Sequence, residues 1–252
     1  MLVFRIANRL RKLIVMRINA LATGLFGLII GSHLVSAGSI SGKVTLEGTP
    51  KKEITIKMAA DPRCAALHKA PVTTRHYVVG EGNGLANVIV YLKTGVEAKD
   101  YAVPSEKPLL DQEGCEYKPY VMGVRAKQTF AVKNSDPTLH NVHATPKVSG
   151  NKEFNFAQPT KGMVTDTSFA VEEIPVRFKC DVHPWMFAYV GVFDHPYYAV
   201  TDKNGNFTIK DVPAGTYAVE AYHVKTHRSD PGVMKEVVVD GDEKADFAVV
   251  IP

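Results

Sequence analysis

The chain has 252 residues, 45% of them hydrophobic and 22% charged, which is ordinary for a globular protein with one large or two small cores. Residues 1–37 hold five of the 30 basic side chains and none of the 26 acidic ones, so without them the balance is 25 to 26, a net charge of −1. A net charge near zero gives no overall electrostatic attraction to the phosphates of nucleic acid, so we expect no nucleic-acid partner.

The first 37 residues combine a basic start, an apolar run and small residues that end at Ala37. This pattern is typical of a secretory signal peptide, and we expect cleavage near Ala37. A retained membrane anchor is the alternative, but the apolar run is interrupted at residues 31–33, which makes it short for a membrane span. We therefore expect an exported protein, periplasmic or extracellular, with no membrane span after cleavage.

Short strand-like runs separated by turns fill the chain after residue 38. Residues 39–47 alternate like a strand, residues 51–75 have little period and are predicted as loop, and residues 87–93, NVIVYLK, are rich in strand formers. Further strands are predicted at 119–125, 128–134, 140–146, 167–174, 175–180 and 187–194, with a polar excursion at 146–163. Many short strands with frequent turns favour an all-β fold, a sandwich or a barrel.

The last 55 residues have the pattern of a second, smaller antiparallel sandwich. Asn204-Gly205 lies between two β-forming runs, and this dipeptide predicts a type I′ hairpin turn. Pro213, Gly215 and Asp240-Gly241 mark further turns.

Three cysteines, Cys64, Cys115 and Cys180, are present. An exported protein usually meets an oxidising compartment, so two can pair and one is left over. Because Cys180 lies among metal-binding side chains, the simplest allocation is a Cys64–Cys115 disulfide and a free thiolate at Cys180. The alternative for Cys180 is a small buried apolar residue.

The stretch CDVHPWM, residues 180–186, places a thiol, an imidazole and a thioether in one short loop between two predicted strands. His140, after the Pro-containing turn in NSDPTLH, can complete the site. Two imidazoles, one thiolate and a weak axial Met form the trigonal arrangement of electron-transfer copper. Zinc favours four strong N or S ligands, and one local Cys does not suit an iron–sulfur cluster.

His143 competes with His140 for this role. Positions i and i+3 on a strand face opposite sides, so one strand does not easily give both side chains to one metal. We choose His140, because it lies at the turn end of the strand, and expect His143 to be packed or hydrogen-bonded.

LHNVH together with CDVHPWM resembles the copper motifs of the cupredoxins, especially those of the amicyanin type, and the resemblance covers roughly residues 110–193. It implies a Greek-key β-sandwich of the cupredoxin type that holds one copper ion, cycling between Cu(I) and Cu(II). The implied ligands are His140, Cys180, His183 and Met186. Asn141 matches the residue that tethers the two ligand loops by hydrogen bonding.

The later stretch TDKNGNFTIKDVPAGTY resembles the carboxypeptidase-regulatory-like, or transthyretin-like, β-sandwich. The expected organisation is a signal peptide at 1–37, a β extension and loop at 38–75, a copper domain at 76–195 and this second sandwich at 196–252. Whether residues 38–60 join the copper domain or the second sandwich stays open.

The resemblance implies a one-electron carrier whose partner is a redox protein, such as a dehydrogenase or a cytochrome. We expect His183 near the surface, with Pro184 and Trp185 as an apolar docking rim, although core packing is the alternative for Trp185. A copper carrier, or a cell-envelope interaction module without redox shuttling, is the second hypothesis. No catalytic motif is found, and no enzymatic activity is expected.

Overall fold

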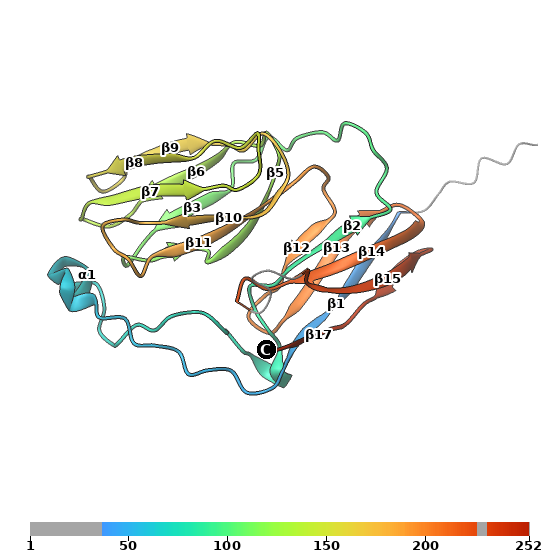
Figure 1. The fold of residues 1–252 in the computed structure, drawn as a ribbon, viewed down its shortest axis with the longest axis horizontal. Helices are drawn as coiled ribbons and strands as arrows, with labels where there is room; N and C mark the ends of the chain where they lie inside the picture. The colour runs from blue at the N-terminus through green and yellow to red at the C-terminus, as the bar shows by residue number, and fades with distance from the viewer. Residues whose placement is uncertain (1–36, 226–230, 252) are drawn as a thin grey trace, which may run out of the picture. The chain divides into compact units, whose positions relative to one another are not determined.

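The structure, a computed structural model, describes residues 37–225 and 231–251 (Figure 1). The expected signal peptide, apart from Ala37, lies outside these residues. The described residues form seventeen strands, one α-helix and two 3-10 helices, so the prediction of an all-β protein is confirmed. Within this part of the chain, no helix combines the length and the apolar character needed to cross a membrane.

Nine consecutive strands form a two-sheet unit that we call the first sandwich. One sheet has the order β5-β11-β10-β7-β8 and the other β4-β3-β6-β9. The strands are β3 (Leu109–Gln112), β4 (Tyr117–Lys118), β5 (Val121–Arg125), β6 (Phe130–Asn134), β7 (His140–Thr145), β8 (Phe154–Gln158), β9 (Val164–Thr167), β10 (Glu173–Lys179) and β11 (Phe187–Phe193).

The core of the first sandwich comes from residues that alternate inward along both sheets. Phe130 on β6 and Phe178 on β10 meet at a ring-centroid distance of 6.1 Å, and Phe169 contacts both. All three rings are buried, and each contributes about 1.5–3 kcal/mol through removal of apolar surface from water. The rigid core fixes the ends of β7 and β10, which are adjacent antiparallel strands.

The second sandwich contains the C-terminal strands and two strands from much earlier in the chain. Its sheets have the orders β13-β1-β16, with β17 also on β1, and β12-β2-β14-β15. The strands are β1 (Gly38–Glu47), β2 (Ile89–Thr94), β12 (Tyr198–Val200), β13 (Asn206–Val212), β14 (Gly215–Tyr222), β15 (Val233–Val239), β16 (Glu243–Lys244) and β17 (Phe247–Val250). The resemblance to a transthyretin-like domain stays a prediction.

The positions of β1 and β2 differ from the expected organisation. The sequence did not decide which sandwich residues 38–60 join. β1, which lies in this range, belongs to the second sandwich, because it pairs with β13 and β17. β2 falls within the expected copper domain, 76–195, but pairs with β12 and β14. The apolar run of β2 is buried on both faces, so it occupies the centre of a sheet rather than an edge.

Other local expectations also differ from the structure. β8 lies in the predicted polar excursion, whereas residues 168–172, predicted as strand, form a connection. At Asn204-Gly205 only Gly205 takes a positive φ, 81°, so the turn is not type I′. The Asp202 carboxylate instead accepts the backbone N–H of Asn204 and of Asn206, which fixes the turn from its first residue.

The long connection between β1 and β2 reaches the first sandwich and returns. It contains η1 (Met58–Ala60), α1 (Pro62–Ala66) and η2 (Glu81–Asn83). Figure 1 shows α1 beside one end of the first sandwich, and Met58 and Cys64 are buried in the core of that sandwich. We call residues 58–68 the cap segment.

Candidate metal centre

The loop from Cys180 to Met186 is a tight connection between β10 and β11. The Cys180 N–H donates to the Met186 carbonyl at 3.2 Å, and the Met186 N–H donates to the His183 carbonyl at 2.9 Å. Cys180, His183 and Met186 are each 1% exposed. The loop therefore turns its thiol, imidazole and thioether inward.

His140 is brought to the same place by a turn whose geometry is set by Asn134. The Asn134 side chain donates to the Thr138 carbonyl at 2.8 Å and accepts the Asp136 N–H at 2.9 Å. His140 follows as the first residue of β7 and is fully buried. Since β7 and β10 are antiparallel neighbours, the start of β7 and the end of β10 meet at one edge.

Three donors converge there. His140 Nδ1 lies 3.0 Å from His183 Nδ1, and Cys180 Sγ lies 3.7 Å from His183 Nδ1. The ligand atoms of the three residues are all within 4.8 Å of one another. Met186 is buried in the same apolar cluster as Cys180. The structure thus brings residues of two distant segments to one point.

Both imidazoles are held from their outer nitrogens by carboxylates. Asp136 Oδ2 lies 2.9 Å from His140 Nε2, and Asp61 Oδ2 lies 3.1 Å from His183 Nε2. An ionised carboxylate only accepts hydrogen bonds, so each Nε2 must carry the proton that it donates. The two Nδ1 atoms then lie 3.0 Å apart, a distance at which their lone pairs can share one metal ion or one proton.

The pKa values of both carboxyl groups are consistent with this assignment. The hydrogen bond from His183 lowers the pKa of Asp61 to about 2, with contacts from Arg63 adding to the effect against partial burial. Burial would raise the pKa of Asp136, but hydrogen bonds from His140 and from the backbone of Cys115 and Gly114 outweigh it, and the pKa is lowered. Both groups are therefore charged acceptors at neutral pH.

The free thiol of Cys180 is also biased towards its charged form. Burial raises the pKa of Cys180, but the contact with the His183 ring and hydrogen bonds from the backbone N–H groups of Asn141, His183 and Val182 outweigh it, so the pKa lies below its usual value. A thiolate is the form that binds metals, so the site favours the species that coordination needs.

Asn141 ties the two ligand segments together. Its side-chain oxygen accepts the Asp181 N–H at 2.6 Å and the Val182 N–H at 3.3 Å, and its own N–H points to Cys180 Sγ at 3.5 Å. One residue of β7 therefore fixes the loop that carries Cys180 and His183. This arrangement matches the tethering role that the resemblance implied.

His143 points away from this centre, as expected from its position on the strand. Its Nδ1 lies 2.7 Å from Asp181 Oδ2, and its Nε2 lies 2.7 Å from Glu153 Oε1. The expectation of a hydrogen-bonded histidine is confirmed.

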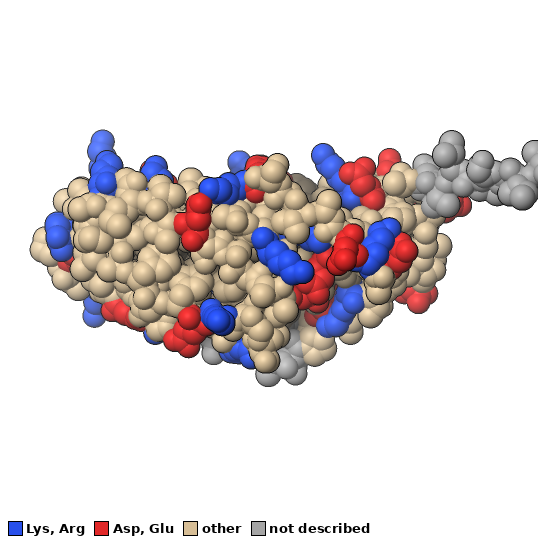
Figure 2. Space-filling view, turned by 90° about the horizontal axis from the view of Figure 1, so that it is seen from above, with Lys and Arg blue, Asp and Glu red and all other residues tan. Residues whose placement is uncertain are grey.

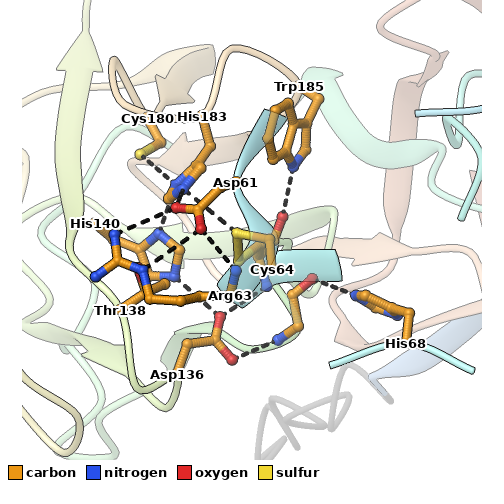
Figure 3. Close-up of a disulfide and its surroundings, with 12 residues drawn as sticks. Asp61, Arg63, Cys64, His68, Asp136, Thr138, His140, Cys180, His183 and Trp185 are labelled. Carbon is orange, nitrogen blue, oxygen red and sulfur yellow. Dashed lines mark hydrogen bonds and ion pairs between the residues drawn. A yellow bond between two sulfur atoms is a disulfide. The ribbon is translucent and has the colours of Figure 1, made fainter. Parts of the chain in front are cut away.

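The predicted Cys64–Cys115 disulfide is present and adjoins the centre (Figure 3). Cys64 Sγ lies 3.4 Å from His183 Nε2, and the cap segment covers that edge of the ring together with Asp61. The expectation that His183 lies near the surface is therefore wrong. The physical reason is the long β1–β2 connection, which had been predicted only as loop but places a helix and a disulfide over the imidazole.

The two residues expected to form a docking rim differ from each other. Pro184 is exposed, whereas Trp185 is half-buried and donates its Nε1–H to the Cys115 carbonyl at 3.1 Å. Packing against the disulfide accounts for the placement of Trp185.

Among the described residues, two other groups of possible metal donors share atoms with this centre: Cys64, Cys115 and His183, and Cys115, Asp136 and His140. Both include cysteines that form the disulfide, so their sulfurs are not available as thiolates. The set of His140, Cys180 and His183 is the one in which every donor is free to bind.

Asp61 and Asp136 were not predicted as part of the site. Asp61 precedes Pro62, and an Asp followed by Pro is a signal for the start of a helix. Asp136 lies four residues before His140, next to Pro137 in the turn NSDPTLH. Neither signal identifies a histidine partner by itself.

No family model and no curated protein matches the chain. Several solved structures do. A copper-containing nitrite reductase from Thermus scotoductus SA-01 is 17% identical with a TM-score of 0.32, over 41% of this chain and 25% of the reductase. A purple cupredoxin from Nitrosopumilus maritimus is 22% identical with a TM-score of 0.29, over 34% of this chain and 99% of its own.

An amicyanin variant in its Cu(I) form is 20% identical with a TM-score of 0.30, over 41% of this chain and 97% of its own. The structural neighbours are thus cupredoxins and a copper enzyme of which this chain spans about a quarter. All three likenesses cover less than half of this chain.

Proposed function

We propose that this protein is an exported mononuclear copper protein that carries single electrons between redox partners. The observation that carries the proposal is the pair of Nδ1 atoms 3.0 Å apart, each on a ring whose other nitrogen donates to a carboxylate, beside a buried free thiol. The proposed ligands are His140, Cys180, His183 and, as the weak axial group, Met186.

The donor set fits copper in chemistry and spacing. Nitrogen and sulfur atoms that share one metal at about 2.0–2.3 Å lie roughly 3–4 Å apart, which is the range observed between these side chains. Two imidazoles, a thiolate and a thioether are the soft and intermediate donors of electron-transfer copper sites. Structural zinc sites favour four strong ligands, and this centre offers three with a weak thioether.

A bound copper ion would supply the one-electron couple between Cu(I) and Cu(II). The residues of the chain supply a fixed and dry environment. Asp136 and Asp61 orient the imidazoles, and Asn141 fixes the loop against β7. A scaffold that holds the same donor positions for both oxidation states keeps the reorganisation of each transfer small.

The closure of the centre favours electron transfer over delivery of copper to another protein. His140, Cys180 and His183 are all buried, and the outer edge of His183 is covered by the cap segment. Delivery of copper would require a ligand of the receiving protein to reach the metal, and the buried donors leave no path for it. Electron transfer does not require a partner atom to contact the metal. The alternative function, a copper carrier or an envelope module, requires the cap to open.

The proposed partner is a redox protein, and the proposed docking surface is the side of the loop at Pro184, with Trp185 beneath it. Export to the periplasm or the exterior rests on the sequence of residues 1–37. The proposed role is that of a carrier without catalytic turnover.

The test is the visible spectrum and redox titration of the chain from Gly38, loaded with one equivalent of copper. We expect an intense thiolate-to-copper band and a reversible one-electron couple. Cys180→Ser should abolish the band, whereas His143→Gln, on the same strand as His140 but turned away, should keep it. A band that survives Cys180→Ser would overturn the ligand assignment. A colourless protein that binds Cu(I) and passes it to a chelating acceptor would support the carrier function instead.

A further inference from the structure

The outer edge of the His183 ring is enclosed by the cap segment rather than by solvent. Asp61 Oδ2 lies 3.1 Å and Cys64 Sγ lies 3.4 Å from Nε2, and Trp185 packs against the ring at a centroid distance of 5.2 Å (Figure 3). Asp61 and Cys64 are far from the ligand loop in sequence, whereas Trp185 belongs to the loop itself. The cap therefore bears directly on one proposed ligand.

The two carboxylate oxygens of Asp61 accept hydrogen bonds from different donors. Oδ1 accepts the Arg63 N–H at 2.8 Å and so begins α1, while Oδ2 accepts the Nε2–H of His183. The side chain is only 15% exposed, so its charge is partly shielded from water. Fixing Nε2 as the donor leaves Nδ1 as the lone pair that faces Cys180 and His140.

The position of Asp61 depends on a small number of anchors. α1 has five residues, and its Cys64 is joined to Cys115, whose backbone N–H donates to Asp136 Oδ2 at 2.7 Å. His68, just after the helix, contacts the Gly114 carbonyl at 2.7 Å. The disulfide thus connects the partner of His183 to the partner of His140 through two covalently linked residues.

We propose that Asp61 is a positioning residue for His183, and that the Cys64–Cys115 disulfide holds it in place, so that the cap tunes the potential of the centre and retains its metal. This inference rests on the proposed function. Carboxylates that accept the second ring N–H of a ligating histidine fix the ring and raise its basicity, and their loss typically weakens metal binding about 10- to 100-fold.

The sign of the electronic effect follows from the charge. The Asp61 carboxylate lies on the far side of the His183 ring from the proposed copper position, and its negative charge stabilises the more positive oxidation state, Cu(II). Removal of this charge should therefore raise the reduction potential. Asp61→Asn is the sharpest change, because the Asn oxygen can keep the helix-starting hydrogen bond from Arg63 while the NH2 group replaces the oxygen that accepts from His183. The substitution keeps the shape of the side chain and removes both the charge and the acceptor for His183. Asp166→Asn is the matched control, since Asp166 is an exposed carboxylate of the same sandwich paired with Lys107.

The first measurement compares the copper-loaded variants. We expect Asp61→Asn to raise the reduction potential and to speed the loss of Cu(I) to a chelator about 10- to 100-fold, whereas Asp166→Asn should change neither. A potential and an exchange rate that match the unsubstituted protein would overturn the role of Asp61.

The second measurement tests the disulfide by a double-substitution cycle. If the disulfide holds Asp61 in place, the Cys64→Ser/Cys115→Ser chain should show the same upward shift, and adding Asp61→Asn should change it little further. Additive shifts would show that the disulfide and Asp61 act independently, and would overturn that part of the proposal.

The third measurement needs no metal and separates this inference from the proposed function. Nitrogen-15 NMR of the metal-free chain reports which ring nitrogen of His183 carries a proton. We expect Nε2–H in the unsubstituted protein and in Asp166→Asn, and a mixture of ring forms in Asp61→Ala. An unchanged His183 signal in Asp61→Ala would overturn the inference, even where the copper spectrum supports the proposed function.

Discussion

The two sandwiches have similar apolar cores but use buried polar groups in opposite ways. In the second sandwich, Glu220 is the buried carboxylate, and it binds Lys93 at 2.5 Å, the Tyr91 hydroxyl at 2.5 Å and the Gly232 N–H. Lys93 and Tyr91 belong to the neighbouring strand β2, and Gly232 immediately precedes β15. The charge therefore joins one strand to another and leaves no donor free for chemistry.

In the first sandwich, one chain of buried polar side chains leads to the edge where the metal donors lie. The Gln112 amide donates to the Gln158 side-chain oxygen at 2.5 Å, and the Asn134 amide donates to the Gln158 carbonyl at 2.8 Å. Asn134 in turn fixes the turn that carries Asp136 and His140. Burial of polar groups is costly unless they are paired, and here the pairing places donors that remain available to a metal.

The largest expected effect tests whether the two cores depend on each other. Phe178 and Phe247 are matched: each is a fully buried ring on a strand, one in each sandwich. Truncation of either to Ala should lower the free energy of unfolding by about 3–5 kcal/mol. A third cluster, with Ile89, Tyr91 and Phe193 among its members, joins strands of both sandwiches. We therefore expect the two to unfold together.

Trp185, the single tryptophan, makes this measurable in urea. Its fluorescence reports the first sandwich, while far-ultraviolet circular dichroism reports all strands. Both Phe178→Ala and Phe247→Ala should shift the two signals together. A fluorescence transition that Phe247→Ala leaves unmoved would show that the sandwiches unfold independently.

The next effect concerns the disulfide, for which the second sandwich has no counterpart among the described residues. Cys64 and Cys115 are 51 positions apart, and the chain-entropy relation gives about 4 kcal/mol for closing a loop of that length. Cys64→Ser/Cys115→Ser should therefore lower the free energy of unfolding by about that amount, measured by Trp185 fluorescence in urea. A loss below roughly 1 kcal/mol would mean that the cap is held by its noncovalent contacts alone.

The sequence was sufficient for the local chemistry of the first sandwich. Alternation predicted most of its strands, and counting the cysteines predicted the disulfide. The opposite facing of residues three apart on a strand predicted that His143 points away from the centre. Each of these inferences depends on spacing along a short segment. The donor types at positions 180–186 were likewise visible without any knowledge of the fold.

The sequence was insufficient where distant segments had to be matched. An apolar run such as NVIVYLK can occupy the centre of any sheet, so its pairing with β12 and β14 could not be read from its composition. The cap segment has no period, and only the folded chain shows that Asp61 reaches His183 across 122 positions. The buried state of His183 was missed for the same reason.

The smallest expected effect contrasts the pH dependence of the two sandwiches. Hydrogen bonding to Glu153, and then to Asp181, raises the pKa of His143 above its usual 6.5. Its folded pKa is the higher one, so its contribution to stability is fully present below pH 6.5 and is lost as the pH rises through the raised value. Metal-free His143→Gln should therefore be less stable than the unsubstituted chain at pH 6, by about 0.2–1 kcal/mol, with the difference shrinking towards pH 9.

Glu220→Gln is the control for the second sandwich. Burial opposes ionisation of Glu220, but its hydrogen bonds with Lys93, Tyr91 and Gly232 outweigh burial, and the pKa is below the usual 4.5. Its contribution is present above pH 4.5 and is lost only on acidification, so the Glu220→Gln difference should be flat from pH 6 to pH 9. Urea titrations across this range measure both differences. If the loss of unfolding free energy in His143→Gln stays constant from pH 6 to pH 9, the charge of His143 does not contribute to stability. The two sandwiches would then not differ in their pH dependence over this range.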